Sequence, residues 1–260
     1  QGTPTVSLVD PLSGDLINQF HVYETQFAGG VRTAIADMNG DGVDDIIVAP
    51  GEGRVAEVRV FDVSGTEMSE YRLRPFGPTF LGGVNIALGD VDGDGVNDLI
   101  AAQSRGSTVS IFRGNSESGW ETSPFRSYTP YGSTHLAGVN VAVADIGEIT
   151  NGTINQMESK DGRSELVIGT GAGAIKPVQI VDVSGSPIVV AELAADSVLD
   201  SSGVQLSTGL YDDDSVDDIF ISSGRGVSAG TDVYQAFRQD GLSLANSKKS
   251  LTSGNGSNTV

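Results

Sequence analysis

A unit of roughly 53 residues recurs along this chain, and it constrains the fold more than any other feature of the sequence. The unit's first aspartate is Asp37, and its counterparts in the next two copies are Asp90 and Asp145. A fourth copy carries Leu210 at this position, and the interval before it is longer because the third unit holds an insertion. Units of this length are typical of repeat architectures, in which neighbouring units bury a shared core.

The residue pattern of each unit predicts four short strands. The first two flank an acidic loop and are continuously apolar, as expected for strands covered on both faces. The third strand alternates apolar and polar residues and ends in a Ser-Gly turn, and the fourth carries charges as an outer edge strand does. The segments with these patterns are 84–88 (first strand), 98–102 (second), 56–62 and 177–182 (third), and 70–74 (fourth).

The pattern predicts an all-β fold, a β-propeller built from four-stranded antiparallel blades of about 53 residues. We expect four full blades plus an N-terminal half blade, because residues 1–27 contain only the last two strands of a unit. The half blade is either part of a longer protein or completes a blade elsewhere. The expected blades are 28–80, 81–135, 136–200 with the insertion near 147–158, and 201–249, followed by a flexible tail or linker at 250–260.

The acidic loops predict metal binding. Carboxylates at alternate positions direct oxygens to one point when the backbone curls, a backbone carbonyl completes the shell, and glycines at positions 4 and 6 allow the tight turn. Oxygen-only ligands favour Ca²⁺ over softer metals. The ligands predicted from the two intact copies are Asp37, Asn39, Asp41, Val43 and Asp45, and Asp90, Asp92, Asp94, Val96 and Asp98.

Two further copies are degenerate, so the sequence predicts two clear calcium sites and up to four. The weaker candidates are Asp145, Asp161 and Glu165 in the third unit, and Asp212, Asp214, Val216 and Asp218 in the fourth. An EF-hand would need Glu at position 12 and a following helix. Position 12 is Val48 or Ala101 and a strand follows, so the EF-hand and dockerin-like interpretations are rejected.

Composition narrows the possible partners. The net charge of −19 argues against nucleic acid, because phosphates would be repelled. The chain has no cysteine, which excludes disulfides and thiolate chemistry and leaves calcium as a substitute staple outside cells. The sequence has no continuous apolar stretch of the length that inserts in a membrane, about 18 residues or more.

The second copy, from Gly82-Gly83 through Asp90 to Ile100, resembles the FG-GAP or VCBS-like repeat of integrin α-chain propellers and many bacterial extracellular proteins. Segments 49–51, 169–171 and 222–224 approximate the GAP side of that motif. The resemblance extends over nearly the whole chain in four units. It implies a calcium-stapled propeller at the cell surface or outside the cell, often in adhesion proteins.

Three functions remain open: a non-enzymatic calcium-stabilised module for adhesion or structure, a fibre subunit that self-associates by strand or blade completion, and a propeller-type lyase or hydrolase. We favour the first and assign no catalytic residue, since His21 and His135 are expected at the surface. A protein or glycan ligand stays unidentified. Aromatic residues at 120, 125, 128 and 131 predict packing between blades or an exposed binding cluster. Asn151 and Asn255 match the glycosylation acceptor pattern.

Overall fold

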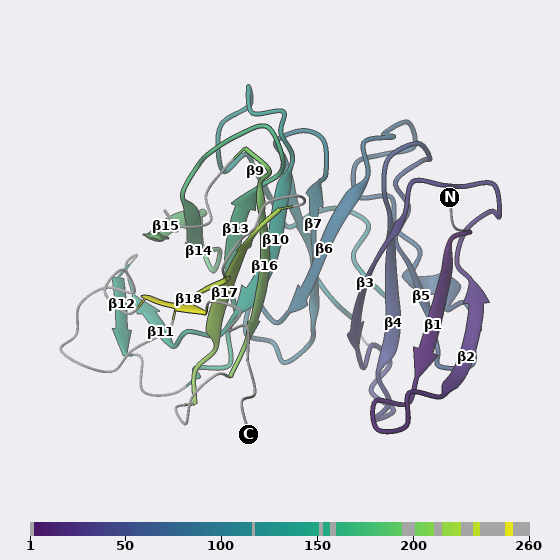
Figure 1. Ribbon diagram of the computed structural model, residues 1–260. Helices are drawn as coiled ribbons and strands as arrows, with labels where there is room; N and C mark the ends of the chain where they lie inside the picture. Colours follow the sequence, from purple (N-terminus) through teal and green to yellow (C-terminus); the bar gives the residue numbers. More distant parts are fainter. Residues whose placement is uncertain are drawn as a thin grey trace, which may run out of the picture. The chain divides into compact units, whose positions relative to one another are not determined.

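The computed structural model describes residues 3–115, 118–150, 153–156, 160–193, 201–210, 215–224, 231–234 and 248–251 (Figure 1). The described residues contain antiparallel β-sheets and no α-helix. Two compact units, residues 1–141 and 142–260, divide the chain, and each is described by itself. The prediction of an all-β fold built from four-stranded antiparallel sheets is therefore confirmed.

Unit 1 contains three sheets in chain order. A two-stranded sheet, β1 (Thr5–Val9) with β2 (Leu16–His21), corresponds to the predicted half blade. A three-stranded sheet follows, with β3 (Val31–Ala36), β4 (Asp45–Pro50) and β5 (Arg59–Phe61). The third sheet has four strands: β6 (Val84–Gly89), β7 (Asp98–Gln103), β8 (Val109–Phe112) and β9 (Arg126–Tyr128).

Among its described residues, unit 2 contains two four-stranded sheets and one hairpin. The first sheet has β10 (Val139–Ala144, which begins before the unit boundary), β13 (Glu165–Thr170), β14 (Val178–Asp182) and β15 (Ile188–Leu193). The second has β16 (Val204–Gly209), β17 (Asp218–Ser223), β18 (Thr231–Tyr234) and β19 (Lys248–Leu251). The predicted insertion forms the hairpin, β11 (Glu148–Thr150) with β12 (Thr153–Gln156). Strand β19 runs into the predicted tail as far as Leu251, and the remainder of that tail lies outside the described residues.

The prediction of a fourth strand at 70–74 is wrong. A 3-10 turn, η1 (Ser69–Tyr71), occupies this position, and a single bridge between Val58 and Leu73 follows it. The turn places the ring of Tyr71 in the core, where its hydroxyl donates to the carbonyl of Met38 (2.5 Å). Residues 70–74 thus bury the Tyr71 side chain and do not pair as a strand along their whole length. The third strand is also shorter than predicted, since β5 covers only part of 56–62.

Burial within the sheets also differs from the prediction. The second and third strands, such as β7 and β8, are buried along almost their whole length, whereas the first strands β3 and β6 are only partly buried. Ile35 on β3 is 67% exposed. The second and third strands are central in the four-stranded sheets, so neighbouring strands cover both of their edges, while a first strand lies at a sheet edge.

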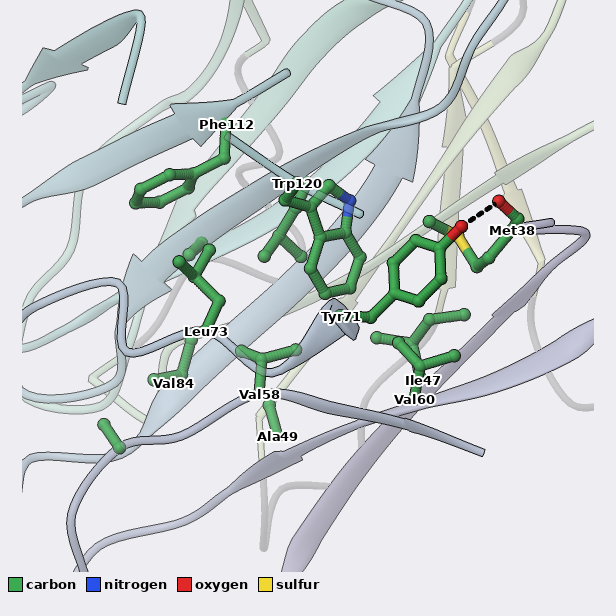
Figure 2. Packing of buried hydrophobic residues seen from close by; sticks show 13 residues of the cluster. Met38, Ile47, Ala49, Val58, Val60, Tyr71, Leu73, Val84, Phe112 and Trp120 are labelled. Carbon is green, nitrogen blue, oxygen red and sulfur yellow. Dashed lines mark hydrogen bonds between the residues drawn. The ribbon is translucent and has the colours of Figure 1, made fainter. Parts of the chain in front are cut away.

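The largest core of unit 1 packs β3–β5 against β6–β8 (Figure 2). Ile47 and Val60 lie on the first side, and Leu99 and Phe112 on the second. The rings of Tyr71 and Trp120 meet edge to face, with centroids 5.5 Å apart and planes at 81°. Trp120 is 5% exposed, which favours the packing interpretation for this member of the aromatic set.

Glycines set the close approach of successive repeats. Gly83 and Gly138 have positive φ (74° and 87°) and lie against the backbone of the preceding repeat. A Cβ atom at Gly83 would come within 2.9 Å of the Gly51 carbonyl carbon, and one at Gly138 within 2.1 Å of the Ser104 carbonyl oxygen. The same arrangement recurs in unit 2, where Gly203 lies against Gly171. The glycine that precedes β6, β10 or β16 is therefore a contact point for the segment that follows the second strand of the repeat before it.

Candidate metal centre

Loop 1 (residues 37–45) joins β3 to β4 and is organised by its first aspartate. Oδ1 of Asp37 accepts hydrogen bonds from the N–H groups of Gly40 (2.8 Å) and Asp41 (3.2 Å), and Oδ2 accepts one from Gly42 (2.8 Å). These bonds, chiefly the one from Gly42, hold the pKa of Asp37 below its usual range. The carboxylate therefore stays ionised and closes the turn at the same time.

Loop 2 (residues 90–98) joins β6 to β7 and repeats this pattern. Asp90 accepts from Gly93 (2.7 Å) and Asp94 (3.2 Å) through Oδ1, and from Gly95 (2.7 Å) through Oδ2. The last aspartate is also equivalent in the two loops, because Asp98 accepts from the N–H of Val91 (3.1 Å) as Asp45 does from Met38 (3.1 Å). Two copies of the loop thus have one geometry.

Carboxylate oxygens converge in loop 2. One oxygen from each of Asp90, Asp92 and Asp98 lies within 4.8 Å of the others. Oδ1 of Asp92 is buried and has no hydrogen-bond partner among the described residues. These carboxylate oxygens are hard metal ligands, and one of them is buried without a hydrogen bond. The set therefore fits a cation such as Ca²⁺. Asp94 lies outside this set and directs Oδ1 to the N–H of Val96 (2.8 Å).

Arg113 reduces the net negative charge of loop 2. Its Nε donates to Oδ2 of Asp92 at 2.6 Å. The four acidic ligand positions of loop 2 with this arginine give −4 + 1 = −3. Loop 1 also has −3 at its ligand positions, because the second one is the neutral Asn39. The two loops therefore offer a cation the same net charge by different means.

Burial raises the pKa of the last aspartate in loops 1 and 2. Asp98 is 1% exposed, and this burial raises its pKa to about 6 despite hydrogen bonds from Gly114 and Val91. Burial likewise raises the pKa of Asp45. Without a cation, the ionised form of Asp98 is less stable in the folded than in the unfolded chain, so a bound cation would remove a cost that the fold otherwise carries.

This raised pKa makes the stability of the calcium-free protein depend on pH. The folded chain binds the Asp98 proton more tightly than the unfolded chain does, so the contribution of Asp98 to the unfolding free energy falls as pH rises from about 4 to about 6, by on the order of 2 kcal/mol. Urea unfolding of the metal-free protein should therefore show a steeper fall with pH than the D98N variant does. In calcium the sign reverses, and the affinity of loop 2 should rise with pH through about 6. Equal pH slopes for the wild type and D98N would contradict the prediction.

Loop 3 (residues 145–165) keeps the same geometry around a long insertion. Asp145 accepts from the N–H groups of Asp161 (3.2 Å) and Gly162 (2.9 Å), and Glu165 accepts from Ile146 (3.2 Å). Asp161, Gly162 and Glu165 are thus equivalent to Asp94, Gly95 and Asp98. Burial raises the pKa of Glu165 to about 8 and also raises the pKa of Asp145. A cation would have to displace a proton from Glu165 at neutral pH.

The third and fourth loops, both in unit 2, are joined directly. The N–H of Asp145 donates to Oδ2 of Asp217 (3.0 Å), and the N–H of Asp217 donates to the Asp145 carbonyl (3.0 Å). Nζ of Lys160 lies 2.6 Å from Oδ1 of Asp217. Of the predicted ligands in the fourth loop, Val216 and Asp218 are buried. Asp212 and Asp214 lie outside the described residues, as do the glycosylation candidates Asn151 and Asn255.

Sequence reasoning missed two partners of these loops. Arg113 and the N–H of Gly114, which donates to Oδ1 of Asp98 (2.9 Å), follow β8 and approach loop 2 through the fold. Sequence patterns could not identify them, because they lie far from loop 2 along the chain. The sole signal was the position of Arg113 directly after the apolar strand that pairs with β7.

The two histidines occupy different environments. His21 is exposed, as predicted, and its Nδ1 lies 3.1 Å from the hydroxyl of Thr5. The prediction of a surface position for His135 is wrong, because it is 9% exposed and its Nε2 lies 3.0 Å from the carbonyl of Gly138. Neither ring lies in an acidic loop.

The remaining aromatic candidates differ in their surroundings. Phe125 lies under the guanidinium groups of Arg113 (4.6 Å) and Arg126 (5.2 Å). Tyr128 on β9 is partly buried, and Tyr131 lies beside His135, with ring centroids 5.1 Å apart. The cluster is therefore packed against its own chain rather than presented as an exposed aromatic surface.

Antiparallel sheets in series, with loops 1, 2 and 3 between the first and second strands of three of them, define a class of β repeat proteins with oxygen-rich turn sites. Comparison with protein families agrees: residues 37–101 match the FG-GAP-like repeat. The match begins at the first aspartate of loop 1 and ends in β7, so it covers both intact loops, and the predicted resemblance is confirmed there. A comparison with the curated proteins gave no match. In the described part of the chain, no helix is long and apolar enough to cross a membrane.

Proposed function

We propose that this chain is a non-enzymatic, calcium-stabilised β-propeller module that acts outside the cell in adhesion or as a structural element. The observation that carries the proposal is the shared geometry of loops 1 and 2, where one aspartate closes the turn and a buried aspartate anchors its end. In loop 2 this arrangement gathers three carboxylates. Such a loop lies between the first two strands of a sheet, where a bound cation would brace the fold.

Ring closure and location are parts of the same proposal. Three four-stranded sheets and one three-stranded sheet in series support blades, and the FG-GAP-like match supports a propeller made from them. The lack of cysteine and the acidic loops suit a setting where calcium is abundant and serves as the staple.

A calcium titration tests the proposal. Isothermal calorimetry at pH 7 should give two tight ions per chain, in loops 1 and 2, with much weaker binding of magnesium, which demands a stricter geometry. A third ion should bind more tightly as pH rises above about 8, because Glu165 then loses its proton. The D37N and D90N variants should each lose one tight ion, whereas D44N, which removes an exposed charge outside the ligand positions, should keep both. Absence of calcium binding at pH 7 would refute the proposal.

A second candidate function is a fibre subunit that self-associates. It is favoured by one observation: among the described strands, β1 pairs only with β2, so the other edge of β1 can accept a strand from a second copy. Light scattering in calcium should then show a mass that grows with concentration. A monomer at all concentrations would exclude it.

A further inference from the structure

A groove in unit 1 is rich in arginine although the chain is strongly acidic. The groove, a hollow of about 460 Å³, is lined by the side chains of Arg54, Arg59, Arg72 and Arg74 together with Glu24 and Glu57. These are four of the 15 basic residues of a chain with net charge −19. Arg59 begins β5 and the other three come from the segments on either side of that strand, outside the acidic loops.

The inner arginines are occupied by structural ion pairs. Arg59 is bound to the buried carboxylate of Glu57 (2.7 Å), and Arg54 makes a two-point contact with Glu24 (3.1 and 3.2 Å). The guanidinium of Arg54 also lies over the ring of Tyr23, 4.0 Å from its centroid. These contacts fix the floor of the groove.

The outer arginines keep unused donors. Arg72 is 43% exposed and directs Nε and Nη2 to Oε1 of Glu67 (2.9 and 2.6 Å), while Arg74 is 53% exposed and directs Nε and Nη2 to Oε2 of Glu57 (2.8 Å each). Nη1 of both residues has no partner among the described residues. Guanidinium groups with spare donors on a fixed floor suit recognition of a planar oxyanion.

The charge of the groove favours a monovalent anion. Four arginines and the three glutamates at 24, 57 and 67 give +4 − 3 = +1. A carboxylate matches this charge, whereas a doubly charged phosphate would face the glutamates with excess negative charge.

A second hollow, of about 480 Å³, shares Glu24, Gln26 and Arg54 with the groove. Its other lining residues are Phe27, Ala28, Gly29, Glu52 and Gly53, so it has fewer charged residues than the groove and one aromatic ring. A chain that presents an acidic side chain to the groove can place an apolar side chain in this neighbouring hollow. Extended peptides offer that combination at adjacent positions.

We propose that the arginine groove binds a carboxylate of an acidic peptide segment through Arg72 and Arg74, with an apolar neighbour of that carboxylate in the second hollow. The site is separate from the acidic loops and does not depend on their binding calcium. The inference rests on the proposed adhesion role, for which it identifies the chemistry of a partner, and a failure here would leave the calcium titration unaffected.

Fluorescence anisotropy with a labelled, blocked peptide tests this site. The peptide carries one glutamate beside one leucine between glycines, and the full chain is saturated with calcium. We expect binding that weakens with added salt and is lost when glutamine replaces the peptide's glutamate. R72Q and R74Q should each weaken binding by about tenfold, the size expected for a charged hydrogen bond. K176Q, which removes an exposed positive charge in unit 2 outside both hollows, should leave binding unchanged.

The E67Q variant separates binding from a purely structural role. Removing the carboxylate that competes for Arg72 should tighten peptide binding several-fold, whereas loss of a structural ion pair would only lower stability. Melting curves of every variant report whether it is folded. No binding by the wild type, equal binding by R72Q and K176Q, or tighter binding of a uronic acid oligosaccharide than of the peptide would each overturn the proposal.

Discussion

Removal of calcium with excess EDTA is expected to lower the melting temperature of this protein by about 10–20 °C. A ligand present at about 100 times its dissociation constant stabilises the folded state by about 2.7 kcal/mol per site, so two sites give about 5 kcal/mol. Chelation also restores the cost of burying Asp98 and Asp45 as charges without a cation. Differential scanning calorimetry in calcium and in EDTA measures the effect.

Matched variants assign this effect to the loops. D37N and D90N should each remove about half of the calcium-dependent stabilisation, because each weakens the carboxylate that closes one turn. D44N changes the net charge equally but leaves the ligand positions intact, and loop 2 already has Asn97 at the equivalent place. It should therefore keep the full calcium shift. A melting temperature that EDTA leaves unchanged would rule out the calcium staple.

The G138A substitution is expected to destabilise unit 1 by about 3 kcal/mol or more. The added Cβ would come within 2.1 Å of the Ser104 carbonyl oxygen, and backbone cannot yield as a side-chain end can. The positive φ of 87° adds strain for any residue with a Cβ. Chemical denaturation measures the loss.

G132A is the control for this substitution. Gly132 has nearly the same φ, 85°, but a Cβ there would meet no atom within 4 Å. It should therefore cost only the backbone strain, about 1 kcal/mol. Equal losses in G132A and G138A would show that conformational strain, and not the close approach of two repeats, explains the glycine.

The repeat made most of the fold predictable. The spacing from Asp37 to Asp90 indicated one sheet per repeat, and the strands on either side of loop 2 lie where the apolar runs placed them. The second strands are buried as predicted, because strands on both sides cover them. The absence of a fourth strand in the first repeat was not predictable. The alternation of apolar and polar residues cannot reveal that Tyr71 reaches the carbonyl of Met38.

The candidate site was predictable only where it is local in sequence. The roles of Asp37 and Asp90 follow from carboxylate and glycine spacing, and the structure gives them as acceptors of three backbone hydrogen bonds each. Arg113 and Gly114 follow another strand, so no spacing rule could place them beside loop 2. The burial of His135 likewise depends on how the chain folds around it, which no local pattern shows.

Loop 3 shows how much added chain a turn of this type can carry. Its hairpin, β11 with β12, enters between Ile146 and Asp161, yet the hydrogen bonds around Asp145 keep the pattern of the uninterrupted loop. The corresponding place in loop 2 lies between Val91 and Asp94. This point is therefore a natural grafting position, where a foreign hairpin or a peptide tag can be displayed while the sheet beneath it keeps its register.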